Sequence, residues 1–150
     1  MKGAIAEIHA SLVGKDGSAV GIHAADSPVE VPVGQYRLTA LSVTLKDASG
    51  RWSYVFSDMI GSRPPAWHEV RKGQDLNLDP IGRLELAIDL PGDATPPSIT
   101  VQPRLFTAEG LLINSGSHGD GPGERPPTTA RVSILDDQGD TKDATTSGFS

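Results

Sequence analysis

Apolar and polar residues alternate with a period of two along most of the chain, which predicts β-strands. Residues 4–12 place small and apolar side chains on one face and Glu7, His9 and Ser11 on the other, as in a half-buried strand. The turn-forming residues 14–18 and a second apolar run over 19–24 then predict a β-hairpin over residues 4–24. Valines at positions 29, 31 and 33 predict a further short strand.

A long strand is expected over residues 36–46, and its apolar face changes parity part-way. The apolar side chains stand at even positions up to Ala40 and at odd positions from Leu41 onward. Because successive side chains point to opposite faces of a sheet, this change predicts a bulge near residues 39–41 or a bend that carries the strand into a second sheet.

The later part of the chain predicts several more strands separated by polar loops. Strands are expected around residues 52–56, 67–70, 84–90, 99–105, 111–114 and 130–134, and Leu76 and Leu78 begin another alternation. Residues 115–129 read as a surface loop and 136–147 as a polar tail. About ten short strands and no helix indicate an all-β fold, a β-sandwich.

One domain over residues 1–150 is expected. Residues 91–97, with three prolines and a glycine, are a possible internal boundary that would make 98–150 an appended set of strands. Glycine and proline together number 29 of 150 residues (17 and 12), which fits many short elements and excludes a helical bundle. No apolar run approaches the roughly 20 residues that a membrane-spanning helix needs, so no membrane insertion is expected.

Charge and cysteine content narrow the possible partners. The net charge is −6 and the basic residues do not cluster, so a nucleic-acid partner is not expected. The absence of cysteine removes disulfides and thiolate sites. The first residues do not form the apolar core of a signal peptide. We nevertheless expect a secreted, periplasmic or cell-surface module that is a mature form or a piece of a larger protein.

Two short motifs carry a resemblance to a known family. The first, over residues 29–38, reads V-E-V-P-V-G-Q-Y-R-L, and the second, over 70–78, reads V-R-K-G-Q-D-L-N-L. The pair resembles the prealbumin-like, carboxypeptidase-regulatory-like sandwich of bacterial exported and surface proteins, over roughly residues 29–90. The resemblance implies a prealbumin-like or, more loosely, immunoglobulin-like domain with a structural, linking or adhesive role.

Candidate catalytic and metal-binding residues do not form recognisable motifs. The sequence contains four histidines, His9, His23, His68 and His118, and no pair of them has metal-ligand spacing. A site assembled only by the fold is the alternative, but we expect solvated residues, no metal site and no cofactor. No G-x-S-x-G sequence supports a serine hydrolase, and we expect no enzyme. The aspartates at 136, 137 and 140, with those at 16, 26 and 120, either form hairpin turns or supply oxygen ligands to Ca²⁺; the turn interpretation is preferred.

An aromatic stripe leaves two interpretations open. Trp52, Tyr54 and Phe56 share one strand face, and Trp67 could extend it. With only 7 aromatic residues in the chain, most of them are expected in the core. Exposed rings at Trp52, Tyr54 and Trp67 would instead make a platform for a polysaccharide.

The function expected from the sequence is that of a non-enzymatic structural or interaction module. Its partners would be other proteins or further copies of itself. The first strand, Ala4–Leu12, and the last, around Ala130–Ile134, are expected at sheet edges where a neighbouring copy can add a strand. A carbohydrate-binding module is the alternative.

Overall fold

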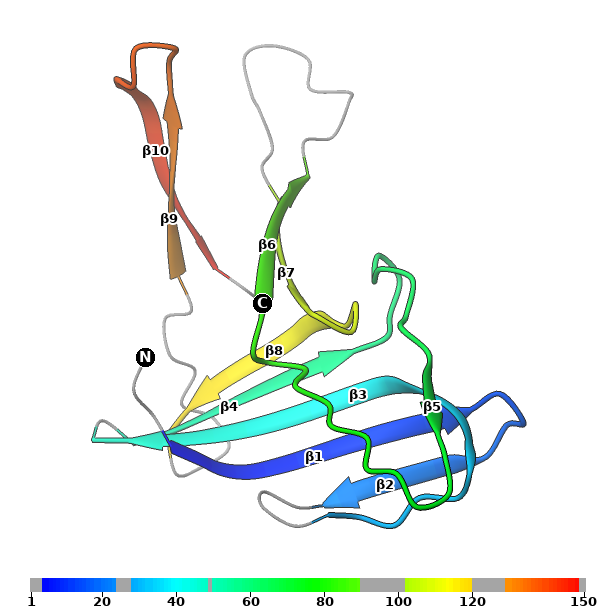
Figure 1. Ribbon diagram of the computed structural model, residues 1–150. Helices are drawn as coiled ribbons and strands as arrows, with labels where there is room; N and C mark the ends of the chain where they lie inside the picture. Colours follow the sequence, from blue (N-terminus) through cyan, green and yellow to red (C-terminus); the bar gives the residue numbers. More distant parts are fainter. Residues whose placement is uncertain (1–3, 24–27, 49, 90–101, 120–128, 149–150) are drawn as a thin grey trace.

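The computed structural model describes residues 4–23, 28–48, 50–89, 102–119 and 129–148. Within these residues the chain forms ten antiparallel strands and no helix, so the all-β prediction is confirmed. An eight-stranded and a two-stranded sheet make the fold sandwich-like (Figure 1). The strands are β1 (Ala4–Gly14), β2 (Ala19–His23), β3 (Gly34–Asp47), β4 (Gly50–Ser57), β5 (His68–Val70), β6 (Leu84–Asp89), β7 (Gln102–Thr107), β8 (Leu112–His118), β9 (Thr129–Leu135) and β10 (Thr141–Gly148).

The main sheet runs in the order β2-β1-β3-β4-β8-β7-β6, and β5 pairs with the start of β3. β8 returns to pair with β4, so residues 102–118 complete the same sheet as the first half of the chain. Only β9 and β10 form a sheet of their own, which Figure 1 shows standing apart from the long strands. The possible boundary at residues 91–97 lies outside the described residues.

β3 is the central strand, and its change of parity is a β-bulge. Ser11 of β1 lies opposite Ala40, but the next residue, Leu12, lies opposite Leu38. Thr39 is therefore the extra residue, and it returns the apolar side chains of both halves of β3 to one face. The bulge prediction is confirmed, and β3 stays within one sheet.

The core lies on one face of the main sheet and is centred on β3. Its buried side chains are those of Leu12, Tyr36, Leu38, Leu41, Val43, Phe56 and Leu111. Val70 of β5 and Leu105 of β7 pack against the cluster, as do Leu78 and Ile81 from the irregular segment 71–83. Figure 1 shows this segment, in green, crossing β1 and β3 between β5 and β6. We call it the covering segment.

Several predicted elements were wrong. The valines at 29, 31 and 33 lie in irregular chain, where Pro28 and Pro32 lack the N–H groups that a strand ladder requires. Leu76 and Leu78 belong to the covering segment instead of a strand. Residues 115–118 extend β8, and the expected polar tail contains β10, because backbone pairing with β4 and β9 compensates for the lack of apolar side chains.

The prediction of β1 as an edge strand was wrong for residues 9–13, whereas residues 4–8 pair only with β3 among the described residues. Residues 9–13 of β1 pair with β2 on one side and with β3 on the other. The edges of the main sheet are β2 and β6. The predicted edge at residues 130–134 lies in β9, which pairs with β10 in the two-stranded sheet.

Candidate functional site

β6 is an edge strand with an exposed apolar face. It pairs with β7 from Leu84, opposite Thr107, to Asp89, opposite Gln102, and no described residue pairs with its other edge. Leu84, Leu86 and Ile88 alternate along it, and they are 45%, 58% and 58% exposed. We call these three side chains the β6 face. Sequence alternation identified this face correctly, but its exposure could not be predicted from the alternation.

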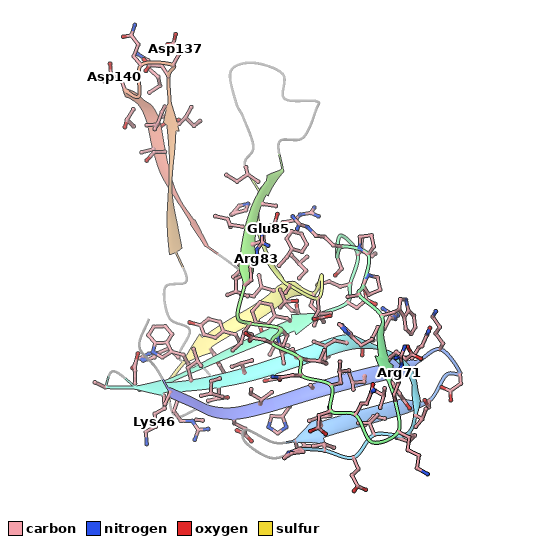
Figure 2. The ribbon with its side chains drawn as sticks, in the orientation of Figure 1. Lys46, Arg71, Arg83, Glu85, Asp137 and Asp140 are labelled. Atoms are coloured by element: carbon pink, nitrogen blue, oxygen red, sulfur yellow. The ribbon has the colours of Figure 1, made fainter. Side chains whose placement is uncertain are left out.

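The opposite side of β6 is fixed by an ion pair at its base. Arg63 donates two hydrogen bonds to the Glu85 carboxylate, at 2.5 and 2.8 Å, and its guanidinium lies 4.5 Å from the centre of the Phe106 ring. The Arg63 hydrogen bonds lower the pKa of Glu85. Figure 2 shows Glu85 and Arg83 at the start of β6. Glu85 on the polar face of β6 is therefore bound by Arg63, while the apolar face is exposed to solvent.

An open pocket of about 310 Å³ adjoins this ion pair. It lies between residues 63–66 and the turn that joins β7 to β8, and Arg63, Arg83 and Glu85 contribute its charged groups. Two of these charged groups, Arg63 and Glu85, bind each other.

The candidate aromatic platform is divided between two ends of β3. Trp52 lies opposite Leu45, whereas Trp67 precedes His68, which lies opposite Tyr36. Nine residues of β3 separate those positions, roughly 30 Å of strand. The structure therefore does not bring Trp52, Tyr54 and Trp67 onto one surface.

Each ring of the candidate platform has its own surroundings. Trp52 stacks on His118, with ring centres 4.1 Å apart. Tyr54 packs against the core, and burial, followed by the charge of Asp47, raises its pKa. Trp67 is 42% exposed, and Lys15 and Arg37 lie 5.1 and 5.9 Å from its ring centre. Trp67 alone retains a broadly accessible ring.

The acidic turns have internal partners. The Asp136 carboxylate accepts hydrogen bonds from the backbone N–H groups of Gln138 and Asp140, and Lys142 lies 2.8 Å away. The Lys142 bond, followed by these backbone bonds, lowers the Asp136 pKa. Asp16 likewise accepts bonds from Ser18. This geometry is that of Asx turns. Figure 2 shows Asp137 and Asp140 at the tip of the β9–β10 hairpin, and Asp26 and Asp120 lie outside the described residues.

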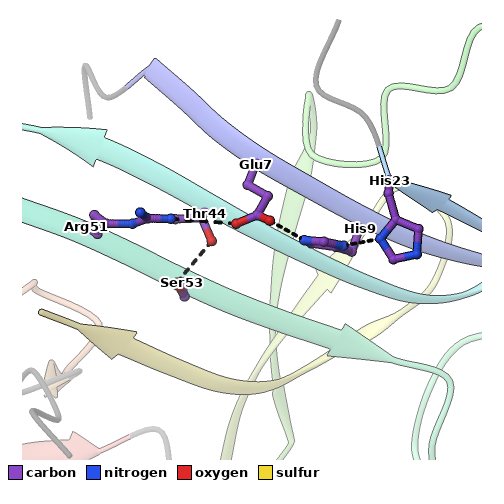
Figure 3. A network of polar contacts seen from close by, with 6 residues as sticks. All are labelled: Glu7, His9, His23, Thr44, Arg51 and Ser53. Carbon is purple, nitrogen blue, oxygen red and sulfur yellow. Dashed lines mark hydrogen bonds and ion pairs between the residues drawn. The ribbon is translucent and has the colours of Figure 1, made fainter. Parts of the chain in front are cut away.

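Two histidines that sequence reasoning treated as solvated meet across the β1–β2 hairpin. His9 lies directly opposite His23, and their Nδ1 atoms are 2.6 Å apart. Glu7 and Arg51 extend the row, as Figure 3 shows. The sequence does contain a signal for this contact. In a hairpin whose turn is centred on Asp16, residues equally far from Asp16 lie opposite each other, which places His9 opposite His23.

The other two histidines also have partners. His68 lies 2.6 Å from the Glu109 carboxylate and links β5 to the turn between β7 and β8. His118 stacks on Trp52. Among the residues with described positions, no group of three or more histidine, cysteine, aspartate or glutamate side chains is placed to hold a metal ion.

Comparisons of the chain with protein-family models, curated protein sequences and solved structures found no match. Within the described part of the chain, no helix is long and apolar enough to cross a membrane.

Proposed function

We propose that this chain is a non-enzymatic structural module of an exported or surface protein, and that it associates with a second copy of itself through β6. The observation that carries the proposal is the β6 face, an apolar strand face on a free sheet edge. Exposed edges of this kind add a further strand readily, because their N–H and C=O groups have no partner in the sheet.

The sequence of β6 is complementary to itself. When two copies of β6 pair antiparallel about a two-fold axis at Leu86, Leu84 of each copy lies opposite Ile88 of the other. Glu85 then lies opposite Ala87, so this register sets no glutamate against another glutamate. The pairing joins two apolar faces into one and extends the antiparallel sheet across the axis.

The resemblance of residues 29–38 and 70–78 to prealbumin-like sandwiches supports the same role. That resemblance, or the looser immunoglobulin-like one, implies linking and adhesive modules that act without catalysis. A secreted, periplasmic or surface location belongs to the same proposal.

The test is the oligomeric state across a range of concentrations, measured by sedimentation velocity. We expect a monomer–dimer equilibrium in the natural chain that Leu86→Lys abolishes, since a charge at the centre of an edge strand opposes pairing. Leu76→Lys is the matched control: Leu76 is 42% exposed but lies in the covering segment, so this variant should associate normally. A strictly monomeric natural chain, or a Leu86→Lys variant that still dimerises, would refute the proposal.

A second candidate, carbohydrate binding, rests on the exposed ring of Trp67. Stacking of a sugar on this ring would change its emission saturably in a Trp52→Phe variant, in which Trp67 is the remaining tryptophan. Emission that soluble polysaccharides leave unchanged, while iodide quenches it, would eliminate this candidate.

A further inference from the structure

We propose that His9 and His23 form a two-histidine binding site for a divalent transition-metal ion on the β1–β2 hairpin. The two residues come from adjacent strands and lie directly opposite each other in the register. Figure 3 shows them at the end of a row of polar side chains that continues through Glu7 to Arg51. The site is independent of β6 and of the proposed self-association.

The two ring nitrogens are already close to the separation that a shared ion needs. The Nδ1 atoms lie 2.6 Å apart, and the rings meet edge to face with centres 4.7 Å apart. Two nitrogens that each bind one ion at about 2.0 Å lie roughly 3 Å apart in tetrahedral or square geometry. The ion sits off the line between the two nitrogens, so both rings must rotate until their lone pairs converge on it and the nitrogens separate by a few tenths of an ångström.

Glu7 favours the tautomer of His9 that metal binding requires, with the proton on Nε2. The Glu7 carboxylate lies 2.7 Å from His9 Nε2 and accepts its N–H, which leaves the lone pair of Nδ1 directed at His23. Histidines that bind metals commonly donate their second N–H to a carboxylate in this way. Arg51 lies 3.6 Å from the other Glu7 oxygen and helps to hold the carboxylate.

His23 supplies the second nitrogen. Without metal, its Nδ1–H donates to His9 Nδ1; when an ion binds, His23 takes the tautomer with the proton on Nε2, so two neutral imidazoles face the metal. The His9 side chain is 42% exposed, which leaves the remaining coordination positions to water. Since no third protein ligand is placed among the described residues, the affinity will be modest.

The ligand type determines which ions bind. Imidazole nitrogens favour Cu²⁺, Ni²⁺ and Zn²⁺ over Mg²⁺ and Ca²⁺, which prefer oxygen. By the general order of divalent affinities, Ni²⁺ should bind more tightly than Co²⁺.

The test is calorimetric titration of the untagged chain with Ni²⁺ and with Zn²⁺, with circular dichroism to check the fold of each variant. We expect one ion per chain, and at least a tenfold loss of affinity in His9→Ala and in His23→Ala. Glu7→Gln, which retains both ligands, should lose about 10- to 100-fold, because the carboxylate orients His9.

His118→Gln is the control, because it removes a histidine at a distance from the hairpin and should leave the affinity unchanged. The absence of binding, equal affinity in His9→Ala and the natural chain, or a loss confined to His118→Gln would overturn the proposal. Binding of Mg²⁺ as tight as that of Ni²⁺ would equally overturn it, since histidine nitrogens would then not be the ligands.

Discussion

At the scale of single residues, a buried leucine and an exposed leucine have different roles: the first stabilises the fold and the second is proposed to mediate association. Leu41 is 1% exposed at the centre of β3, whereas Leu86 is 58% exposed on β6. Both occupy the apolar face of an alternating strand in the sequence. Leu41 therefore contributes to the stability of the fold, whereas Leu86 is available for contact with another molecule.

Leu41→Ala should therefore lower the free energy of unfolding by about 2–5 kcal/mol, because it leaves a cavity in a packed core. Leu86→Ala should change it by less than about 0.5 kcal/mol when measured at a concentration where the chain is monomeric. Urea unfolding followed by circular dichroism compares the two variants. Equal losses would mean that the β6 face is buried within one chain.

Glu85 gives a prediction for pH. Its hydrogen bonds from Arg63 lower its pKa from the ordinary value of 4.5. The stabilisation from this pair is therefore complete above pH 4.5, and is lost as the pH falls through the lowered folded-state pKa. Carboxyl chemical shifts recorded during an acid titration should give a value below 4.5, and Arg63→Gln should return it towards 4.5. An unchanged Glu85 titration in that variant would mean that the ion pair does not form in solution.

At the scale of elements, the sequence predicted strands best where alternation and turn chemistry agree. The β1–β2 hairpin, the bulge in β3 and the strand at β6 all follow from the parity of apolar residues and the position of turn-forming residues. β10 was missed because its stability comes from backbone pairing with β9, which leaves no apolar signature in Thr141–Gly148. The His9–His23 pair carries no local motif, because the two residues are 14 apart in sequence and only the hairpin register brings them face to face.

The β1–β2 turn contains a glycine with a positive φ. Gly17 has a φ of +83°, and no neighbouring atom limits the space beside it. Gly17→Ala should lower the free energy of unfolding by about 1 kcal/mol through backbone strain alone, and Gly17→Asn should cost less because asparagine adopts this conformation more readily. Thermal unfolding of the two variants tests the order, and the opposite order would contradict this explanation.

At the scale of the whole molecule, the described residues form one large sheet and a hairpin that makes a separate sheet. A two-stranded hairpin has marginal stability by itself in water. The aromatic candidates also belong to this scale, since the sequence could not reveal that β3 separates Trp52 from Trp67. Distances between segments arise from strand order, which alternation does not encode.

Removal of the β9–β10 hairpin should leave the main sheet intact. A chain that ends at residue 119 retains every strand pairing of the eight-stranded sheet. We expect cooperative unfolding, with a midpoint close to that of the full chain, and an unchanged environment of Trp52. Loss of cooperative unfolding would show that β9 and β10 contribute to the core.

The covering segment has a consequence for how the molecule opens. Its Leu78 and Ile81 close the core by side-chain packing, while its backbone belongs to no strand ladder. Such a segment can detach in a partial opening that leaves every strand pair in place. Its amide protons should then exchange with solvent far faster than those of β3, and proteases should cut between residues 71 and 83 sooner than within the strands of the main sheet. Within the described part of the chain, a readily opened segment thus lies directly above the most deeply buried side chains.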